Sequence, residues 1–240
     1  MSLNLEVEFY SREEINAKYA KFLKNKRVAL VGPANGTKGT LQKDIIDGYD
    51  IVVRMNLGFN IPLNIQKDIG KRVDVLYCAL SNYYFSKKII TKNQMLKFKT
   101  KHNMKWFIST GTHRESILKV ASFNKNGINI RQINKKSKNK IKRCVSAKPS
   151  AGFSTIWDLL KHDISELYIA GFTFYKFMIP KCQGRNRYYY SGYSPDYLNH
   201  AGSVYKHNVR GEAAWLKKKT EKDKRIKTDK FLGDILKELK

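Results

Sequence analysis

Short apolar runs recur along this chain, each bounded by glycine, asparagine, aspartate or charge, and helical stretches lie between them. We expect these runs to be strands, because apolar residues that follow one another without polar alternation are typical of strands buried on both faces. The expected strands are residues 27–31, 50–54, 73–77, 106–109, 128–131 and 167–170. Strands that alternate with helices predict an α/β fold with a mostly parallel sheet flanked by helices.

The first run leads into a glycine-containing loop, RVALVGPANGTKGT at residues 27–40, in a position where such loops often meet a ligand. A dinucleotide-binding loop needs the spacing G-x-G-x-x-G, whereas Gly32, Gly36 and Gly39 are four and three residues apart. A phosphate-binding P-loop needs Lys followed directly by Ser or Thr, but Gly39 separates Lys38 from Thr40. Both motifs are excluded by spacing, and a plain strand-to-helix turn stays open at this point.

The chain has 240 residues, 42% of them hydrophobic, which suits one domain of ordinary size. We expect an N-terminal helix within residues 1–25, capped by Ser11 with Glu14 three residues later, a core over 26–218 and a basic helical tail over 219–240. Three widely spaced cysteines without a C-x-x-C pair indicate neither a disulfide framework nor a zinc site. We therefore expect a reducing compartment such as the cytoplasm, with no signal peptide and no transmembrane segment.

A formal charge of +27 predicts an anionic partner. Nucleic acid, an anionic membrane face, a phosphorylated sugar donor and an acidic glycan all meet that requirement, and a lysine-rich composition that only solvates the surface is the alternative. The basic run at 134–148 shows no apolar periodicity, so we expect a solvated connection there that is mobile unless a ligand binds it. The Tyr-, Gly-, Asn- and Pro-rich stretch at 176–206 predicts a long functional loop.

Four sequence motifs occur in a fixed order along residues 26–218. The first spans 28–80, with the glycine loop, then Arg-Met-Asn at 54–56 and Asp-x-Gly-x-Arg at 68–72. The second, PSAGFSTIWDLLKHDISELYIAGFTFY at 149–175, has a Pro-Ser-x-Gly turn that opens a helix and a strand that ends in Gly-Phe. The third is the tyrosine cluster at 188–190, and the fourth is His207, four residues and then Glu212.

Together these motifs resemble those of glycosyltransferase family 29, the eukaryotic-type sialyltransferases. The resemblance implies a Rossmann-like sheet in the GT-A-like variant of sialyltransferases. It also implies transfer of sialic acid or a related ulosonic acid, with inversion, from a CMP-activated donor to a glycan hydroxyl. The implied donor-binding residues are Gly32, Asn35, Asn56, Ser150, Ala151, Gly152, Gly171, Phe172, Thr173, Tyr188 and Tyr189.

The resemblance further assigns His207 and Glu212 to catalysis and leaves Arg54 and Arg72 to lock loops. A general base near pKa 6.5 suits attack by a weakly nucleophilic hydroxyl, and the positive end of a helix expected at 209–218 should keep the His207 imidazole neutral. We expect Glu212 to orient the loop or the acceptor. No Asp-x-Asp pair occurs, so we expect no metal and no cofactor besides the substrate nucleotide.

Several positions depart from the family pattern and indicate a soluble, minimal member. Pro33 stands where animal members have asparagine, so that donor contact is either lost or supplied by Asn35, and Ala151 replaces a hydroxyl residue. The histidine that usually opens the third motif is absent; Tyr188 or Arg187 holds its place, and His200 is a further candidate replacement. Arg27 replaces a cysteine, so we expect no disulfide partner.

Two other functions compete with this interpretation. The positive charge and the lysine runs at 134–148 and 217–230 are compatible with a nucleic-acid-binding protein, although neither run contains the interleaved aromatic residues that stack on bases. A catalytically inactive sugar-nucleotide-binding fold is the second alternative, because Pro33 and Ala151 change expected ligand contacts. The lysine-rich segments are also candidates for attraction to an anionic surface.

Overall fold

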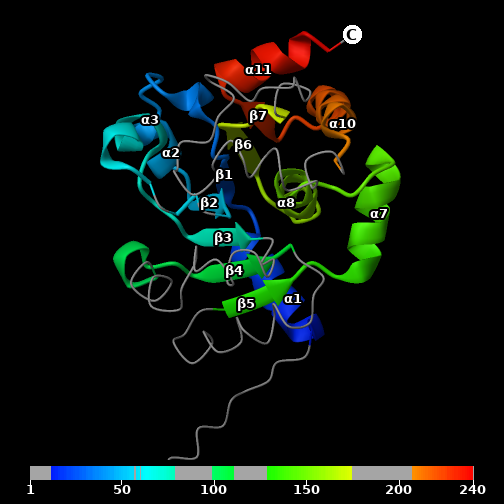
Figure 1. Ribbon diagram of the computed structural model, residues 1–240. Helices are drawn as coiled ribbons and strands as arrows, with labels where there is room; N and C mark the ends of the chain where they lie inside the picture. Colours follow the sequence, from blue (N-terminus) through cyan, green and yellow to red (C-terminus); the bar gives the residue numbers. More distant parts are fainter. Residues whose placement is uncertain are drawn as a thin grey trace, which may run out of the picture.

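The computed structural model describes residues 12–56, 58–59, 61–78, 99–110, 129–174 and 207–239. Within them one sheet runs in the order β5-β4-β3-β2-β1-β6-β7, and every neighbouring pair is parallel (Figure 1). The strands are β1 Arg27–Val31, β2 Ile51–Met55, β3 Val75–Cys78, β4 Trp106–Ser109, β5 Asn129–Gln132, β6 Glu166–Ala170 and β7 Ile226–Thr228. The expected α/β fold with a parallel sheet and flanking helices is confirmed.

Helices cover both faces of this sheet, as a parallel sheet requires. Figure 1 shows α2 and α3 on one side and α7 and α8 on the other. The helices are α1 Arg12–Leu23, α2 Lys43–Asp47, α3 Gln66–Ile69, α7 Lys135–Val145, α8 Ala151–Leu159, α10 Val209–Lys222 and α11 Lys230–Lys237, with short 3₁₀ helices η1 Asn35–Thr37 and η2 Leu63–Ile65.

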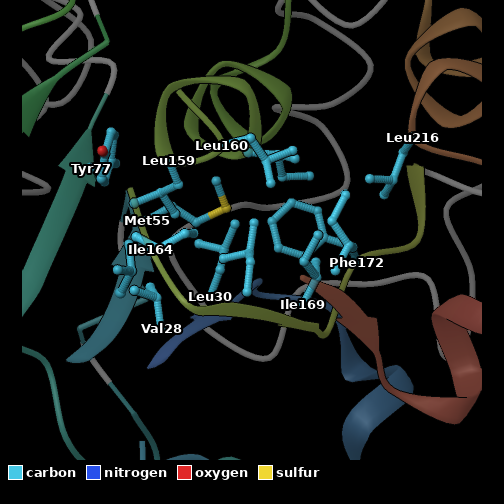
Figure 2. Packing of buried hydrophobic residues seen from close by; sticks show 14 of the residues in the cluster. Val28, Leu30, Met55, Tyr77, Leu159, Leu160, Ile164, Ile169, Phe172 and Leu216 are labelled. Carbon is cyan, nitrogen blue, oxygen red and sulfur yellow. The ribbon is translucent and has the colours of Figure 1, made fainter. Parts of the chain in front are cut away.

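Alternate residues of β1 enter two different hydrophobic clusters. Val28 and Leu30 pack with residues of α1, α8, α10 and α11, whereas Ala29 and Val31 pack with residues of α2 and α3. Figure 2 shows the first cluster, in which Phe172 lies among core side chains. All four apolar β1 residues are fully buried, which explains why the strand has no polar alternation.

The C-terminal part of the chain differs from the expected helical tail. Before α11, residues Ile226–Thr228 form β7, which pairs in parallel with β6 at the edge of the sheet. Ile226 is the one apolar residue of this strand; Lys227 is exposed and Thr228 is only partly buried. A single apolar residue does not form a hydrophobic pattern from which a strand could be predicted. In α11 the buried residues are Leu232, Ile235 and Leu236.

The prediction for residues 134–148 was wrong, because most of this run is the amphipathic helix α7. Asn134 caps it by accepting a hydrogen bond from the Ser137 N–H at 2.7 Å. Ile141 and Val145 are buried on one face. Two buried apolar residues are enough to anchor three turns of helix, while lysines occupy the rest.

The strand order places β1 between β2 and β6, so the chain leaves β1 toward one side of the sheet and later returns on the other. Val31, the last residue of β1, pairs with Arg54 of β2 and with Ala170 of β6. The loops that follow these three strands therefore start side by side. In open parallel sheets, ligands bind at this reversal of strand order, beyond the carboxyl ends of the strands. Among the described helices, none has the length and apolar character needed to cross a membrane.

Candidate functional site

A pocket opens at the carboxyl ends of β1, β2 and β6, where the strand order reverses, and the N-terminus of α8 closes one side of it. Phe172 joins this pocket to the hydrophobic core. The described residues that line the pocket are Pro33, Ala34, Met55, Asn56, Ser150, Ala151, Gly152, Gly171, Phe172, Thr173, Phe174 and Glu212.

The loops after β1 and β6 touch through their backbones. The Gly32 N–H donates to the Ala170 carbonyl at 2.7 Å, and the Ala34 N–H donates to the Gly171 carbonyl at 3.1 Å. A Cβ on Gly32 would overlap the Gly171 carbonyl oxygen, and Gly171 has a φ of +70°, which favours glycine. Gly32 thus permits the close approach of two loops, and it lies outside the lining of the pocket.

Ser150 is the N-cap of α8 and lies at the back of the pocket. Its Oγ accepts a hydrogen bond from the Phe153 N–H at 3.1 Å, which satisfies one of the donors at the helix start. In the described part of the chain, the next two backbone N–H groups, those of Ala151 and Gly152, have no hydrogen-bond partner. Both residues line the pocket, so the positive end of α8 presents free donors to it.

Glu212 of α10 holds Ser150 with both carboxylate oxygens. The Ser150 N–H donates to Oε1 at 2.6 Å and the Ser150 hydroxyl donates to Oε2 at 2.7 Å. Glu212 is fully buried, and this burial raises the pKa of its carboxyl to about 7, against the opposing effect of the two hydrogen bonds. The carboxylate therefore fixes the start of α8 at the wall of the pocket.

His207 lies immediately before Asn208, the N-cap of α10, and its Nδ1 is 2.6 Å from the Lys148 carbonyl oxygen. A carbonyl only accepts hydrogen bonds, so Nδ1 carries the proton and donates it. In the neutral imidazole, Nε2 then has the free lone pair. Burial lowers the pKa of His207, and the nearby Lys148 charge adds to this, so the neutral form is favoured. A neutral imidazole was expected because of the positive end of the helix, but the larger cause of the lowered His207 pKa is burial.

Two further contacts tie the start of α10 to the segment between α7 and α8. The Asn208 side-chain amide donates to the Val145 carbonyl at 3.0 Å, and its oxygen accepts from the Gly211 N–H at 2.9 Å. With the contacts of His207 and Glu212, residues 207–212 are attached to residues 145–150 at three points. His207 is therefore held next to the segment that leads into the pocket.

Arg54 and Arg72 bind backbone carbonyls away from the pocket. Arg54 is fully buried at the end of β2 and donates to the carbonyls of Ile69 and Arg72 at 2.6 and 2.9 Å. Arg72 donates to the Asp47 and Tyr49 carbonyls and forms an ion pair with Asp74 at 2.8 Å. These contacts join the loops on the α2 and α3 side of the sheet.

The structure brings most of the expected donor-binding residues together at one pocket. Those that line it are Asn56, Ser150, Ala151, Gly152, Gly171, Phe172 and Thr173. Neither Gly32 nor the half-buried Asn35 of η1 lines it. Tyr188 and Tyr189, and the alternative histidine His200, lie outside the described residues.

Four residues that shape this site were not predicted from the sequence. Three of them, Ala34, Met55 and Phe174, line the pocket, and only their position next to motif residues in the sequence could have indicated this. Asp229, the N-cap of α11, accepts a hydrogen bond from the Gly171 N–H at 2.9 Å, 58 residues away in sequence. No local pattern indicates that contact. Among the described residues, no three His, Cys, Asp or Glu side chains form a group suited to a metal ion.

Comparison with known proteins places this arrangement among solved structures. No protein-family model matches the chain, and no curated protein matches it by sequence. A crystal structure of a mammalian sialyltransferase is similar over 95% of this chain and 83% of its own, with 14% identity and a TM-score of 0.53. The sialyltransferase CstII from Campylobacter jejuni, solved with cytidine-5'-monophosphate, is similar over 85% and 80%, with 10% identity and a TM-score of 0.54.

The chain has a sialyltransferase-like fold. A second CstII structure, solved with CMP-3FNeuAc, is similar over 85% of this chain and 81% of its own, with 13% identity and a TM-score of 0.50. At these identities the similarity establishes the sialyltransferase fold alone.

Proposed function

We propose that this protein is a glycosyltransferase that moves sialic acid, or a related ulosonic acid, from a CMP-activated donor to a glycan hydroxyl with inversion. The observation that carries the proposal is the pocket at the reversal of strand order, in which the loops after three strands meet the start of α8. The order of the four motifs and the fold neighbours solved with CMP and CMP-3FNeuAc support the same donor class.

In this proposal the donor phosphate lies at the N-terminus of α8. The N–H groups of Ala151 and Gly152, which have no partner among the described residues, can donate to phosphate oxygens, and the positive end of the helix favours the negative charge that grows as CMP leaves. Glu212 acts indirectly, because its contacts with Ser150 keep these donors oriented toward the pocket.

His207 is the proposed general base. As the acceptor oxygen bonds to the anomeric carbon, its proton passes to His207 Nε2, and the bond between that carbon and the phosphate oxygen breaks to release CMP. The Nδ1 hydrogen bond to Lys148 orients the ring before the transfer and remains as a donor contact in the imidazolium that forms.

The proposed reaction needs no metal ion, since the chain has no Asp-x-Asp pair and the start of α8 meets the phosphate charge. Hydrolysis of CMP-sialic acid in the presence and absence of EDTA tests both points. Turnover that survives EDTA is expected. Loss of turnover in EDTA, with recovery on addition of magnesium or manganese, would contradict the metal-independent mechanism.

Binding of CMP and UMP by calorimetry tests the donor class, with Asn56→Ala as the variant. Asn56 lines the pocket at a φ of +49°. Its removal should weaken CMP binding by about 0.5–3 kcal/mol, the range for a hydrogen bond to a polar or charged ligand. Asn25→Ala is the matched control, because Asn25 has a φ of 57° but lies before β1, at the opposite end of the strands. Equal affinity for CMP and UMP, or equal effects of the two variants, would reject the donor assignment.

A further inference from the structure

The solvent-facing side of α7 carries positive charge without any negative charge. Its exposed cations are Lys135, Lys136, Lys140, Lys142 and Arg143. The opposite face is buried through Ser137, Ile141 and Val145. The sequence from residue 116 to residue 157 contains neither Asp nor Glu, so no neighbour along the chain neutralises these cations.

The lysine-rich stretch at 217–240 differs from α7 because it contains acidic residues among its cations. Around α10 and α11, Asp223 is 3.5 Å from Lys219 and 2.8 Å from Arg225, and Asp234 is 3.7 Å from Lys237. The α7 cations have no acidic partner within the described part of the chain. Unpaired lysines also occur elsewhere, but the α7 face differs in having no carboxylate among its five exposed cations or along residues 116–157.

This cationic face begins beside the proposed base. After α7 ends at Val145, the chain passes through exposed Lys148, whose carbonyl binds His207, and reaches Ser150 at the pocket. The Lys138 ammonium donates to the Thr110 carbonyl just beyond β4. Burial, together with the charge of Lys148, lowers the pKa of Lys138 to about 8. Figure 1 shows α7 beside α8, on the same side of the sheet.

We propose that α7 and Lys148 form the acceptor side of the site and bind a negatively charged glycan acceptor. This inference rests on the proposed function, in which the donor anion occupies the α8 N-terminus and the acceptor approaches His207. Exposed lysines on the His207 side then attract anionic groups of the acceptor and hold its hydroxyl near the base. Nucleic acid fits less well, because residues 134–148 contain no aromatic side chain on which a base could stack.

The test compares two variants that remove the same charge. One is Lys135→Gln, Lys136→Gln, Lys140→Gln and Lys142→Gln combined; the control is Lys218→Gln, Lys222→Gln, Lys224→Gln and Lys227→Gln, all at exposed positions. The probes are fluorescein-labelled disialyllactose, a neutral tetrasaccharide of equal length and a single-stranded oligonucleotide. Fluorescence anisotropy at low salt should show disialyllactose affinity reduced about threefold to tenfold by the α7 variant and less than twofold by the control, since exposed charge pairs are individually weak.

Three results would overturn the inference: equal losses in the two variants, equal affinity of the wild type for the acidic and neutral glycans, or α7-dependent binding of the oligonucleotide that exceeds that of disialyllactose. Wild-type hydrolysis of CMP-sialic acid separates this inference from the proposed function. Hydrolysis without a preference for the acidic glycan rejects only the role of α7. Binding of disialyllactose through α7 without any hydrolysis rejects the transferase and leaves an acidic-glycan-binding surface.

Discussion

At the scale of single residues, the hydrogen bond from His207 Nδ1 to the Lys148 carbonyl has the largest chemical consequence. It selects the tautomer in which Nε2 accepts a proton, and burial keeps the ring neutral near pH 7. A base needs both properties. The tautomer is selected by a backbone carbonyl 59 residues away and the neutral state comes from burial, so the motif in the sequence supplied the residue but not the reason for its protonation state.

Two substitutions of His207 separate its chemical role from its structural role. His207→Ala removes base and hydrogen bond together, whereas His207→Asn retains an N–H donor for the Lys148 carbonyl. Both should lose about 10²–10⁴-fold in kcat for transfer, the usual contribution of a general base, while the Kd for CMP is unchanged. Near-normal transfer by folded His207→Asn would show that another residue takes the proton.

Glu212 should make stability depend on pH. Burial raises its pKa in the folded protein from 4.5 to about 7, so between these values the folded state binds a proton that the unfolded state has lost. Its contribution is therefore complete below about pH 4.5 and is lost as pH rises through 7, with a slope of about 1.4 kcal/mol per pH unit.

Urea unfolding of wild type and Glu212→Gln from pH 5 to pH 8 measures this dependence as the difference between the two proteins. Glu221→Gln, at an exposed position of the same helix, controls for loss of a carboxylate. A difference between wild type and Glu212→Gln that is flat across this range would mean that Glu212 stays ionised in the folded protein.

At the scale of elements, the buried strands were the most predictable part of the fold. Each central strand is apolar at successive positions because both faces are covered, and this property is local enough to be recognised. Helix α7 and strand β7 lack such a signal, because lysines occupy their exposed positions and one or two apolar residues anchor them.

The pocket could be predicted only in part, for a related reason. Parallel strands bring their carboxyl ends to one edge of the sheet, so the motifs after β1, β2 and β6 were expected to lie at the same edge. The contacts that orient them, Glu212 with Ser150 and Asp229 with Gly171, join residues 62 and 58 positions apart. A single sequence contains no local pattern for such pairs.

Helix α7 yields a direct test of the corrected assignment. Ile141→Ala should lower the free energy of unfolding by about 2–4 kcal/mol, because the Ile141 side chain is fully buried and its removal leaves a cavity. Lys140→Ala, its exposed neighbour, should change it by less than about 0.5 kcal/mol. Urea unfolding compares the two variants. Equal, small effects would indicate that residues 135–145 do not pack as a helix.

At the scale of the whole molecule, the C-terminal helix supports the pocket. Asp229 caps α11 with one carboxylate oxygen, at 2.7 Å from the Leu232 nitrogen, and binds the Gly171 N–H with the other. Asp229→Ala should lower the free energy of unfolding by about 1–3 kcal/mol, through the lost cap and an unsatisfied buried N–H, and should weaken CMP binding.

The control for this prediction is Asp234→Ala in the same helix. The Asp234 side chain is half exposed and its ion pair with Lys237 is 3.7 Å long, so its removal should change stability by less than about 0.5 kcal/mol. Urea unfolding and CMP calorimetry are measured on both proteins. Weaker CMP binding in both variants, or in neither, would mean that α11 does not position the Gly171 loop.

The reversal of strand order also determines when the site comes into existence during synthesis. β1 is translated before β6, so Val28 has no partner on its second side until Leu167 is made, and the Gly171 loop lacks its contact until Asp229 is made. A nascent chain folds from its N-terminus, so β1, β2 and β3 can assemble while one flank of β1 is still open. The growing polypeptide therefore has no complete pocket until Asp229 has been translated.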